Sequence, residues 1–481
     1  MAGGTQQGGS ARYQAERELI VFVPPAVAGL EPSGDVAEGA PPGFARAFDE
    51  VLGRYGASVA PLFAASQETD APSAFEGARP LFHRVRAKED GALDSLAKEL
   101  FSVPGVEAAY VKPPAEPPML NDMAPTLAEP PGATPDYRPR QVYLKPAPEG
   151  VDAVFAWEQP GGRGEGVTIY DVEGGWCFEH EDLVRNSLGL GGGIVSADMG
   201  WRNHGTAVMG VFGGDQEGRG ITGICPDAKV GAVAIFEIGS AAAIRAAADK
   251  LRPGDILLIE LHRPGPRNDY QGRQDQDGYV AVEWWPDDYD AIRYAVGRGV
   301  IVVEAAGNGA QDLDDPIYDQ PAPGFPRDWI NPYSRKGRDS GAIVVGAGAP
   351  PPGTHGSDHG PDRSRLEFSN YGALVDVQGW GREVTTCGYG DLQSGREEAW
   401  YTDRFSGTSS ASPIVVGALG AVQGILRSRK LPLLTPARAR ALLRNTGSDQ
   451  TDGPDRPQSQ RIGRRPDIRA MVEAATARDQ S

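Results

Sequence analysis

The stretch FSGTSSASP, residues 405–413, lies directly before an apolar run, residues 414–426, whose spacing is typical of a buried helix. Ser409 therefore stands where we expect a helix to begin. A helix N-terminus has unpaired N–H groups and partial positive charge, which stabilise an anion that forms beside the serine. Gly-Thr-Ser strings are also common in turns and helix caps. The interpretation of Ser409 as a nucleophile therefore depends on other segments.

Two further segments supply the other residue types of a serine triad. The strand-like run GVTIYD, residues 166–171, ends in the carboxylate of Asp171, and NHGTAVMG, residues 203–210, opens a helical pattern with His204. Serine is a weak nucleophile, so a histidine must take its proton and a buried carboxylate must orient the imidazole. We therefore expect Asp171, His204 and Ser409 to form a catalytic triad.

A fourth segment, VIVVEAAGNG, residues 300–309, has the pattern of a buried strand that ends in a glycine-flanked turn. Asn308 lies in this turn. Its side-chain N–H could donate a hydrogen bond to the oxyanion of a tetrahedral intermediate, together with the backbone N–H of Ser409. The sequence therefore predicts an oxyanion site at Asn308.

In this order, the four segments resemble those of the subtilases, the subtilisin-like serine peptidases. Four shorter matches agree with the resemblance, which covers roughly residues 151–447: HEDL at 180–183, IVVGA at 343–347, EFSNYG at 367–372 and LTP at 434–436. The resemblance implies an α/β fold with a doubly wound, mainly parallel sheet. It also implies a serine endopeptidase that acts on protein or peptide substrates through an acyl-enzyme, without a cofactor.

The chain departs from the subtilase pattern after the aspartate, where a small residue and then glycine are usual. Here the sequence reads DVEG at residues 171–174, which affects the local turn and not the carboxylate. A second departure lies in DILLIELH, residues 255–262, the strand that the resemblance implies will pair with the substrate backbone. It ends in larger residues where the family has small ones. By resemblance, the substrate-binding residues are Glu260, Leu261, His262, Ala305, Ala306 and Gly307.

Glu260 has two open interpretations. It either recognises a basic P1 side chain by charge pairing or is a structural carboxylate that binds neighbouring groups.

The chain before the catalytic block has a pattern of its own. Residues 1–112 predict a small α+β domain after a disordered N-terminus, because strand, helix and strand patterns occur twice. This ferredoxin-like arrangement resembles the inhibitory propeptide of subtilases, which would keep the enzyme latent until N-terminal processing, and an unrelated interaction domain is the alternative. We expect a Pro/Ala-rich linker at 113–140, the catalytic domain at 141–447, and a polar C-terminal tail with a short helix at 448–481.

Composition narrows the class of partner. The net charge is −18, from 47 basic and 65 acidic residues, which argues against nucleic acid. No long apolar run suggests a membrane span, and the three cysteines do not suggest a disulfide framework. The opening MAGGTQQGGS has neither the basic start nor the apolar core of a secretory signal. We therefore expect cytoplasmic synthesis. Export by a route that needs no signal peptide is left open.

Calcium is also left open, because the acidic loop DLDD, residues 312–315, lies near the asparagine turn but has no EF-hand spacing. No metal-ligating residues are assigned, since the six histidines show no zinc pattern.

Three other functions have less support in the sequence. A sedolisin-type peptidase would have glutamate in place of His204, and an α/β-hydrolase would have a Gly-x-Ser-x-Gly elbow. The main alternative is an inactive, subtilase-like scaffold.

Overall fold

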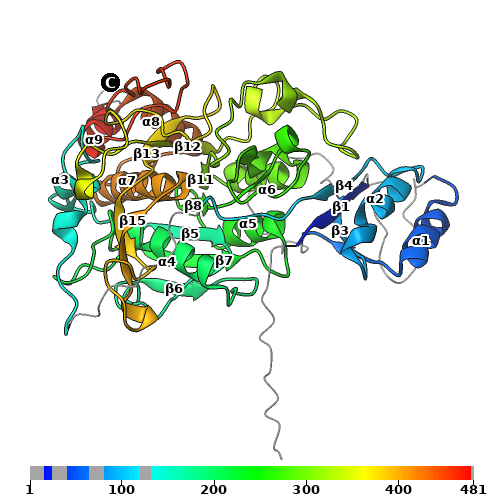
Figure 1. The fold of residues 1–481 in the computed structure, drawn as a ribbon, viewed down its shortest axis with the longest axis horizontal. Coiled ribbons are helices and arrows are strands. Elements are labelled where there is room, and N and C mark those ends of the chain that lie inside the picture. Colours follow the sequence, from blue (N-terminus) through cyan, green and yellow to red (C-terminus); the bar gives the residue numbers. More distant parts are fainter. Residues whose placement is uncertain (1–15, 24–40, 64–80, 120–131, 478–481) are drawn as a thin grey trace, which may run out of the picture.

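The computed structural model describes residues 16–23, 41–63, 81–119 and 132–477. The predicted disordered N-terminus and linker residues 120–131 lie outside the described residues. Two large sheets organise the described chain, one of four strands and one of seven. Figure 1 shows the four-stranded sheet in a lobe beside α5 (Ser240–Ala248) and α6 (Pro286–Gly297) of the larger body.

The N-terminal lobe has the predicted α+β arrangement. Its antiparallel strands follow the order β2-β3-β1-β4, the ferredoxin-like order, with two helices between them along the chain. The elements are β1 (Glu18–Val23), α1 (Phe44–Tyr55), β2 (Ser58–Pro61), β3 (Leu81–Arg86), α2 (Leu93–Phe101) and β4 (Ala108–Lys112).

Each face of this small sheet packs against a different partner. Successive side chains of a strand point to opposite faces, so Leu19 and Val21 pack with the apolar faces of α1 and α2. Ile20 points the other way and joins Tyr110 in the core formed with α5 and α6 of the larger domain. Because both faces are covered, the N-terminal lobe is attached to the larger domain by a buried interface.

The larger domain is built on a parallel sheet, as predicted. Its strand order is β13-β12-β11-β8-β5-β7-β6. On one side of β5 the chain runs outward from β8 to β13, and on the other side β7 lies between β5 and the edge strand β6. The strands are short and almost entirely apolar, which is typical of a sheet covered on both faces. Their bounds are β5 (Thr168–Glu173), β6 (Ser187–Leu190), β7 (Lys229–Ala234), β8 (Ile256–Ile259), β11 (Ile301–Ala305), β12 (Ile343–Gly348) and β13 (Val377–Trp380).

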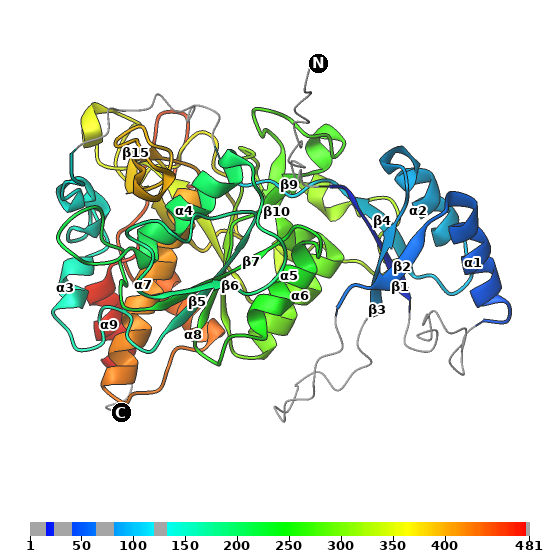
Figure 2. The same cartoon turned by 90° about the horizontal axis from the view of Figure 1, so that it is seen from below.

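Helices cover both faces of this sheet (Figure 2). One face carries α5 and α6, and the other carries α3 (Ala153–Trp157), α4 (Met199–Gly213), α7 (Thr408–Ser428), α8 (Pro436–Asn445) and α9 (Ile468–Ala477). Helix α7 is long and apolar enough to cross a membrane by length and composition, but its most apolar window is completely buried inside the protein. It is the central core helix of that face.

Two hairpins and a C-terminal segment complete the larger domain. The hairpins are β9 (His262–Pro264) with β10 (Tyr279–Ala281), and β14 (Val384–Cys387) with β15 (Tyr401–Phe405). Residues 448–477, which composition predicts as a polar tail, pack on the domain: Arg465 is buried, and Ile468 and Met471 of α9 enter the core beside α7. A polar segment can be held in this way because its charged groups find partners, here Asp362 for Arg465.

Candidate active site

Ser409 lies in the first turn of α7 and is completely buried. The preceding Gly407 has φ 115°, a value that strongly favours glycine. A side chain at Gly407 would also collide with the carbonyl oxygen of Pro118, which would lie 2.2 Å from its Cβ. Ser409 Oγ donates a hydrogen bond to this same oxygen over 2.8 Å. The serine therefore meets a peptide carbonyl at a helix N-terminus.

His204 projects from α4 and is also fully buried. Its Nδ1 is 2.7 Å from Oε2 of Glu173, at the end of β5. Its Nε2 has no hydrogen-bond partner among the described residues. Burial lowers the pKa of His204 to about 3, although the nearby Asp171 carboxyl partly opposes this shift. The imidazole is therefore neutral near neutral pH, as a general base must be.

Glu173, and not Asp171, contacts the histidine. Oδ2 of Asp171 accepts a hydrogen bond from Nε1 of Trp176 over 2.8 Å. Strand β5 runs to Glu173, two residues beyond the end that its apolar pattern predicts. Since side chains alternate along a strand, residues two apart share a face, and both carboxyls point toward the same side of the sheet. The longer strand thus brings the glutamate to the histidine.

Three carboxyl groups close to one another at this site are fully buried: Asp171, Glu173 and Glu260. Burial raises the pKa of each of them well above its ordinary value, and charge repulsion from Glu173 adds to the shift of Asp171. Oε1 of Glu260 accepts a hydrogen bond from the hydroxyl of Ser412 on α7. Buried carboxyls that are close together cannot all be ionised, because burial disfavours each charge and the carboxylates repel one another.

Asn308 follows β11, and hydrogen bonds to its side-chain oxygen fix the side chain in place. Oδ1 accepts hydrogen bonds from the backbone N–H and the hydroxyl of Thr408, each over 2.9 Å. Nδ2 donates to Oε1 of Gln276 over 3.3 Å, and the backbone N–H of Asn308 donates to Nδ1 of His262 over 3.3 Å. The amide therefore faces the first turn of α7, where Ser409 lies.

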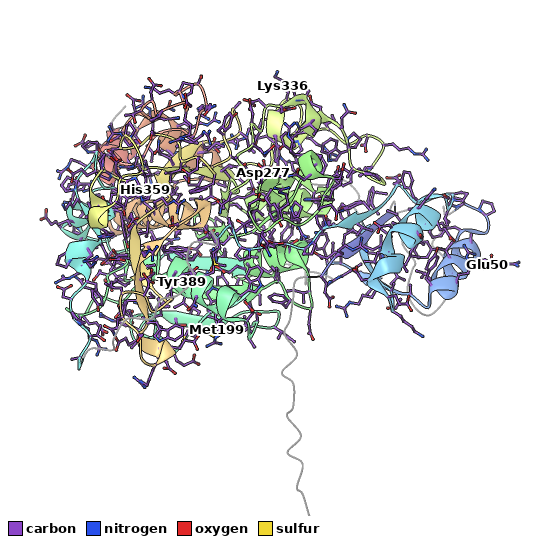
Figure 3. The ribbon with its side chains drawn as sticks, viewed as in Figure 1. Glu50, Met199, Asp277, Lys336, His359 and Tyr389 are labelled. Atoms are coloured by element: carbon purple, nitrogen blue, oxygen red, sulfur yellow. The ribbon has the colours of Figure 1, made fainter. Side chains whose placement is uncertain are left out.

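Residues 116–119 of the predicted linker lie against these groups, and we call the place that they occupy the cleft. Glu116 and His262 form an antiparallel bridge, with backbone N–H to O distances of 3.0 and 3.1 Å. Pro117 O accepts from Gln276, Pro118 O accepts from Ser409, and the Met119 sulfur accepts from the hydroxyl of Tyr389, which is labelled in Figure 3. The segment lies as a peptide bound to the cleft.

The other residues assigned to substrate binding either pack in the core or form hydrogen bonds through their backbone. Leu261 packs in the apolar core, so only its main chain can face the cleft. The carbonyl of Ala306 accepts from Asn370, and the N–H of Gly307 donates to the hydroxyl of Thr408 over 3.2 Å. Ala305 is the last residue of β11 and is buried.

The sequence model of the Subtilase family matches residues 195–463, more than half of the chain. The chain belongs to the subtilase family. This subtilase is 26% identical over 304 residues to the intracellular serine protease of Paenibacillus polymyxa, covering 57% of the chain and 72% of that protein. It is 26% identical over 268 residues to subtilisin-like protease 6 of Trichophyton schoenleinii, covering 54% of the chain and 52% of that protein, so it spans about half the length of this second relative.

Solved structures show the same fold across nearly the whole subtilase. The epidermin leader peptide processing serine protease of Staphylococcus aureus matches with a TM-score of 0.53 and 17% identity, covering 96% of this chain and 99% of that one. Fervidolysin from Fervidobacterium pennivorans matches with a TM-score of 0.53 and 18% identity, covering 98% and 62% respectively. The predicted fold class is thereby confirmed.

A signal in the sequence points to Glu173. The subtilase pattern places a small residue and then a glycine after the acid, and this chain lacks that pair after Asp171. Gly174 and Gly175 supply the pair directly after Glu173. Gly174 packs so closely against Trp201 that an added Cβ would lie 2.3 Å from the indole ring. The sequence therefore departs from the family pattern after Asp171 and matches it after Glu173.

The described part of this subtilase contains no group of three or more His, Cys, Asp and Glu side chains arranged to hold a metal ion. In the acidic loop, the carboxylate of Asp312 accepts from the backbone N–H of Asp314, and that of Asp315 accepts from Ile317. These carboxylates serve local turns.

Proposed function

We propose that this chain is a serine endopeptidase in which Ser409 is the nucleophile, His204 the general base and Glu173 the triad acid. The observation that carries the proposal is the contact between Ser409 Oγ and the carbonyl oxygen of Pro118, made by a peptide that pairs with His262. This contact presents a peptide carbonyl to the serine. The hydrogen bond between Glu173 and His204 places a carboxyl where it can stabilise the imidazolium that forms during the reaction.

The reaction follows from these groups. Ser409 Oγ attacks a peptide carbonyl while Nε2 of His204 takes its proton, because Nδ1 is committed to Glu173. Asn308 Nδ2 and the backbone N–H of Ser409 donate to the oxyanion. His204 then protonates the departing amine, and water releases the acyl-enzyme by the same steps. Asp171, the acid that the sequence favours, instead supports Glu173 in this mechanism.

Latency is the second part of the proposal. Residues 116–119 cover Ser409, and the N-terminal domain that precedes them is attached through buried contacts, so the intact chain is inhibited by its own N-terminus. Cleavage in the linker, or displacement of the segment, opens the cleft. A cytoplasmic location is supported by the similarity to a protease named as intracellular. Protein or peptide is the substrate class, and we propose no role for nucleic acid or membrane.

Fluorophosphonate labelling at neutral pH, read by intact mass, tests both parts. We expect a single adduct that disappears in Ser409→Ala, and we expect shortened chains to label at least tenfold faster than the intact chain. Thermal melting confirms that each chain is folded. An adduct that persists in Ser409→Ala would reject the nucleophile, and equal labelling of intact and shortened chains would reject latency. A folded, shortened chain without an adduct would support the inactive scaffold.

A further inference from the structure

Gln276 joins two parts of the site through its side-chain amide. It lies in the loop between β9 and β10, next to Asp277, which is labelled in Figure 3. Its Nε2 donates to the carbonyl oxygen of Pro117 over 3.1 Å. Its Oε1 accepts from Nδ2 of Asn308 over 3.3 Å. A single amide thus contacts both the peptide in the cleft and the asparagine of the oxyanion site.

The contact with Asn308 completes the support of that amide. Thr408 binds Oδ1 through two hydrogen bonds, and Gln276 takes one of the two hydrogens on Nδ2. The other hydrogen is then available to an oxyanion at Ser409. An oxyanion donor is effective when its direction is fixed before the charge develops, because no reorganisation is then needed during the reaction.

The contact with Pro117 addresses the backbone of the bound peptide. Pro118 carries the carbonyl that meets Ser409, so Pro117 is the residue immediately before the attacked one. Its carbonyl is a backbone group, which every peptide substrate presents at that position. The amide of Gln276 can therefore hold a substrate of any sequence there, together with the antiparallel bridge at His262.

The backbone around Gln276 fixes the amide in place. The residue has φ 57°, a left-handed conformation that is uncommon for glutamine, and its exposed fraction is only 8%. Its N–H donates to the carbonyl of Arg273, and its own carbonyl accepts from the N–H of Tyr279, each over 3.1 Å. Tyr279 in turn reaches the carboxylate of Glu116 in the cleft segment over 2.9 Å. The loop is thus held at Gln276 on both sides.

We propose that Gln276 is a positioning residue that orients Asn308 for the oxyanion and binds the carbonyl of the substrate residue before the attacked one. This inference rests on the proposed function and extends it to the loop between β9 and β10. The two contacts give separate kinetic effects. Losing the contact with Asn308 lowers kcat, because it acts in the transition state, while losing the carbonyl contact raises KM.

The test compares Gln276→Met, Asn308→Ala and the double variant in the expressed full chain, with its processing state recorded by intact mass. Gln276→Met keeps the size of the side chain and removes both hydrogen bonds. We expect kcat to fall about tenfold and KM to rise about threefold, less than the 10²- to 10³-fold that removal of an oxyanion donor costs in subtilisin. In the Asn308→Ala background, the effect of Gln276→Met on kcat disappears and the effect on KM remains.

Gln271→Met is the matched control, because Gln271 is exposed on the same loop. We expect it to stay within twofold of the parent. The rate of fluorophosphonate labelling is measured on the same chains, since the phosphoryl oxygen takes the oxyanion position and no peptide is needed. Thermal melting shows that the loop variants are folded.

An equal loss of kcat from Gln276→Met in both backgrounds would overturn the proposal, because the residue would then act only on the structure of the loop. Values equal to those of Gln271→Met would also overturn it. Ser409→Ala separates this outcome from failure of the proposed function: if it keeps its activity, the nucleophile itself is wrong, whatever Gln276 does.

Discussion

The identity of the proposed triad acid gives the sharpest prediction, because the sequence favours Asp171 whereas Nδ1 of His204 is hydrogen-bonded to Glu173. We compare Glu173→Gln with Asp171→Asn, which remove one carboxylate each and keep the size of the side chain. At 2.7 Å, a carboxylate stabilises an imidazolium by about 6 kcal/mol with an effective dielectric constant of about 20. That energy corresponds to a loss of about 10⁴-fold in kcat for Glu173→Gln.

A second effect acts in the same direction. The amide that replaces Glu173 can donate its N–H to Nδ1 of His204 and leave the proton on Nε2, the tautomer that cannot accept a proton from Ser409. The corresponding aspartate-to-asparagine change in trypsin costs about 10⁴-fold in kcat.

Asp171→Asn should behave differently. Burial and the neighbouring Glu173 raise the pKa of Asp171 well above its ordinary value, which favours the protonated, neutral form of this carboxyl. An asparagine is a close mimic of that form, and its oxygen can still accept from Nε1 of Trp176. We expect kcat within about tenfold of the parent.

The assay is steady-state hydrolysis of a peptide substrate together with the rate of fluorophosphonate labelling, on chains whose thermal melting shows that they are folded. The reverse pattern would refute the reasoning: a loss of about 10⁴-fold for Asp171→Asn with Glu173→Gln within tenfold of the parent would make Asp171 the triad acid.

Three further predictions follow from buried charges. Glu260→Gln should leave the ratio of kcat/KM for lysine and leucine P1 substrates unchanged, because Glu260 is buried against Ser412 and burial raises its pKa; a lower ratio would favour charge recognition. Lys112→Met should speed labelling of the intact chain at least tenfold, since buried Lys112 lies 2.5 Å from Asp287 and 3.2 Å from Asp288, and removing one partner of a buried pair costs about 3–5 kcal/mol. Exposed Lys98→Met is its control, and equal rates for the two variants would exclude this interdomain role. In the intact Ser409→Ala chain, the NMR signals of His204 should not titrate between pH 7 and 5, because burial keeps the imidazole neutral below its ordinary pKa of 6.5; a midpoint near 6.5 would contradict this.

Much of the fold was predictable because it depends on local patterns. Short apolar runs predicted the strands of the parallel sheet, and the FSGTSSASP stretch predicted the start of α7, since a buried helix needs small residues where another backbone comes close. His204 and Asn308 were singled out for the same reason, since His204 lies within the apolar pattern of α4 and Asn308 follows the apolar strand β11. The N-terminal lobe followed from its repeated alternation of strands and helices.

The acid was harder to predict. Asp171 and Glu173 share one face of β5, and the sequence contains a carboxyl at both positions, so periodicity alone cannot choose between them. Only the reach of α4 across the end of the strand decides which carboxyl meets Nδ1 of His204. Gln276 was not predictable at all, because the role proposed for it depends on how the loop between β9 and β10 folds beside Asn308.

The sequence by itself determined the class of this protein: a subtilase with a serine at a helix N-terminus, a histidine, an asparagine and an N-terminal α+β domain. Those features depend on residue type and spacing, which are local properties of the chain. The tertiary structure decided the partners. Glu173 on the histidine, residues 116–119 over Ser409 and Lys112 between Asp287 and Asp288 join segments far apart in the chain, and their contacts depend on how packed elements bring distant backbones together.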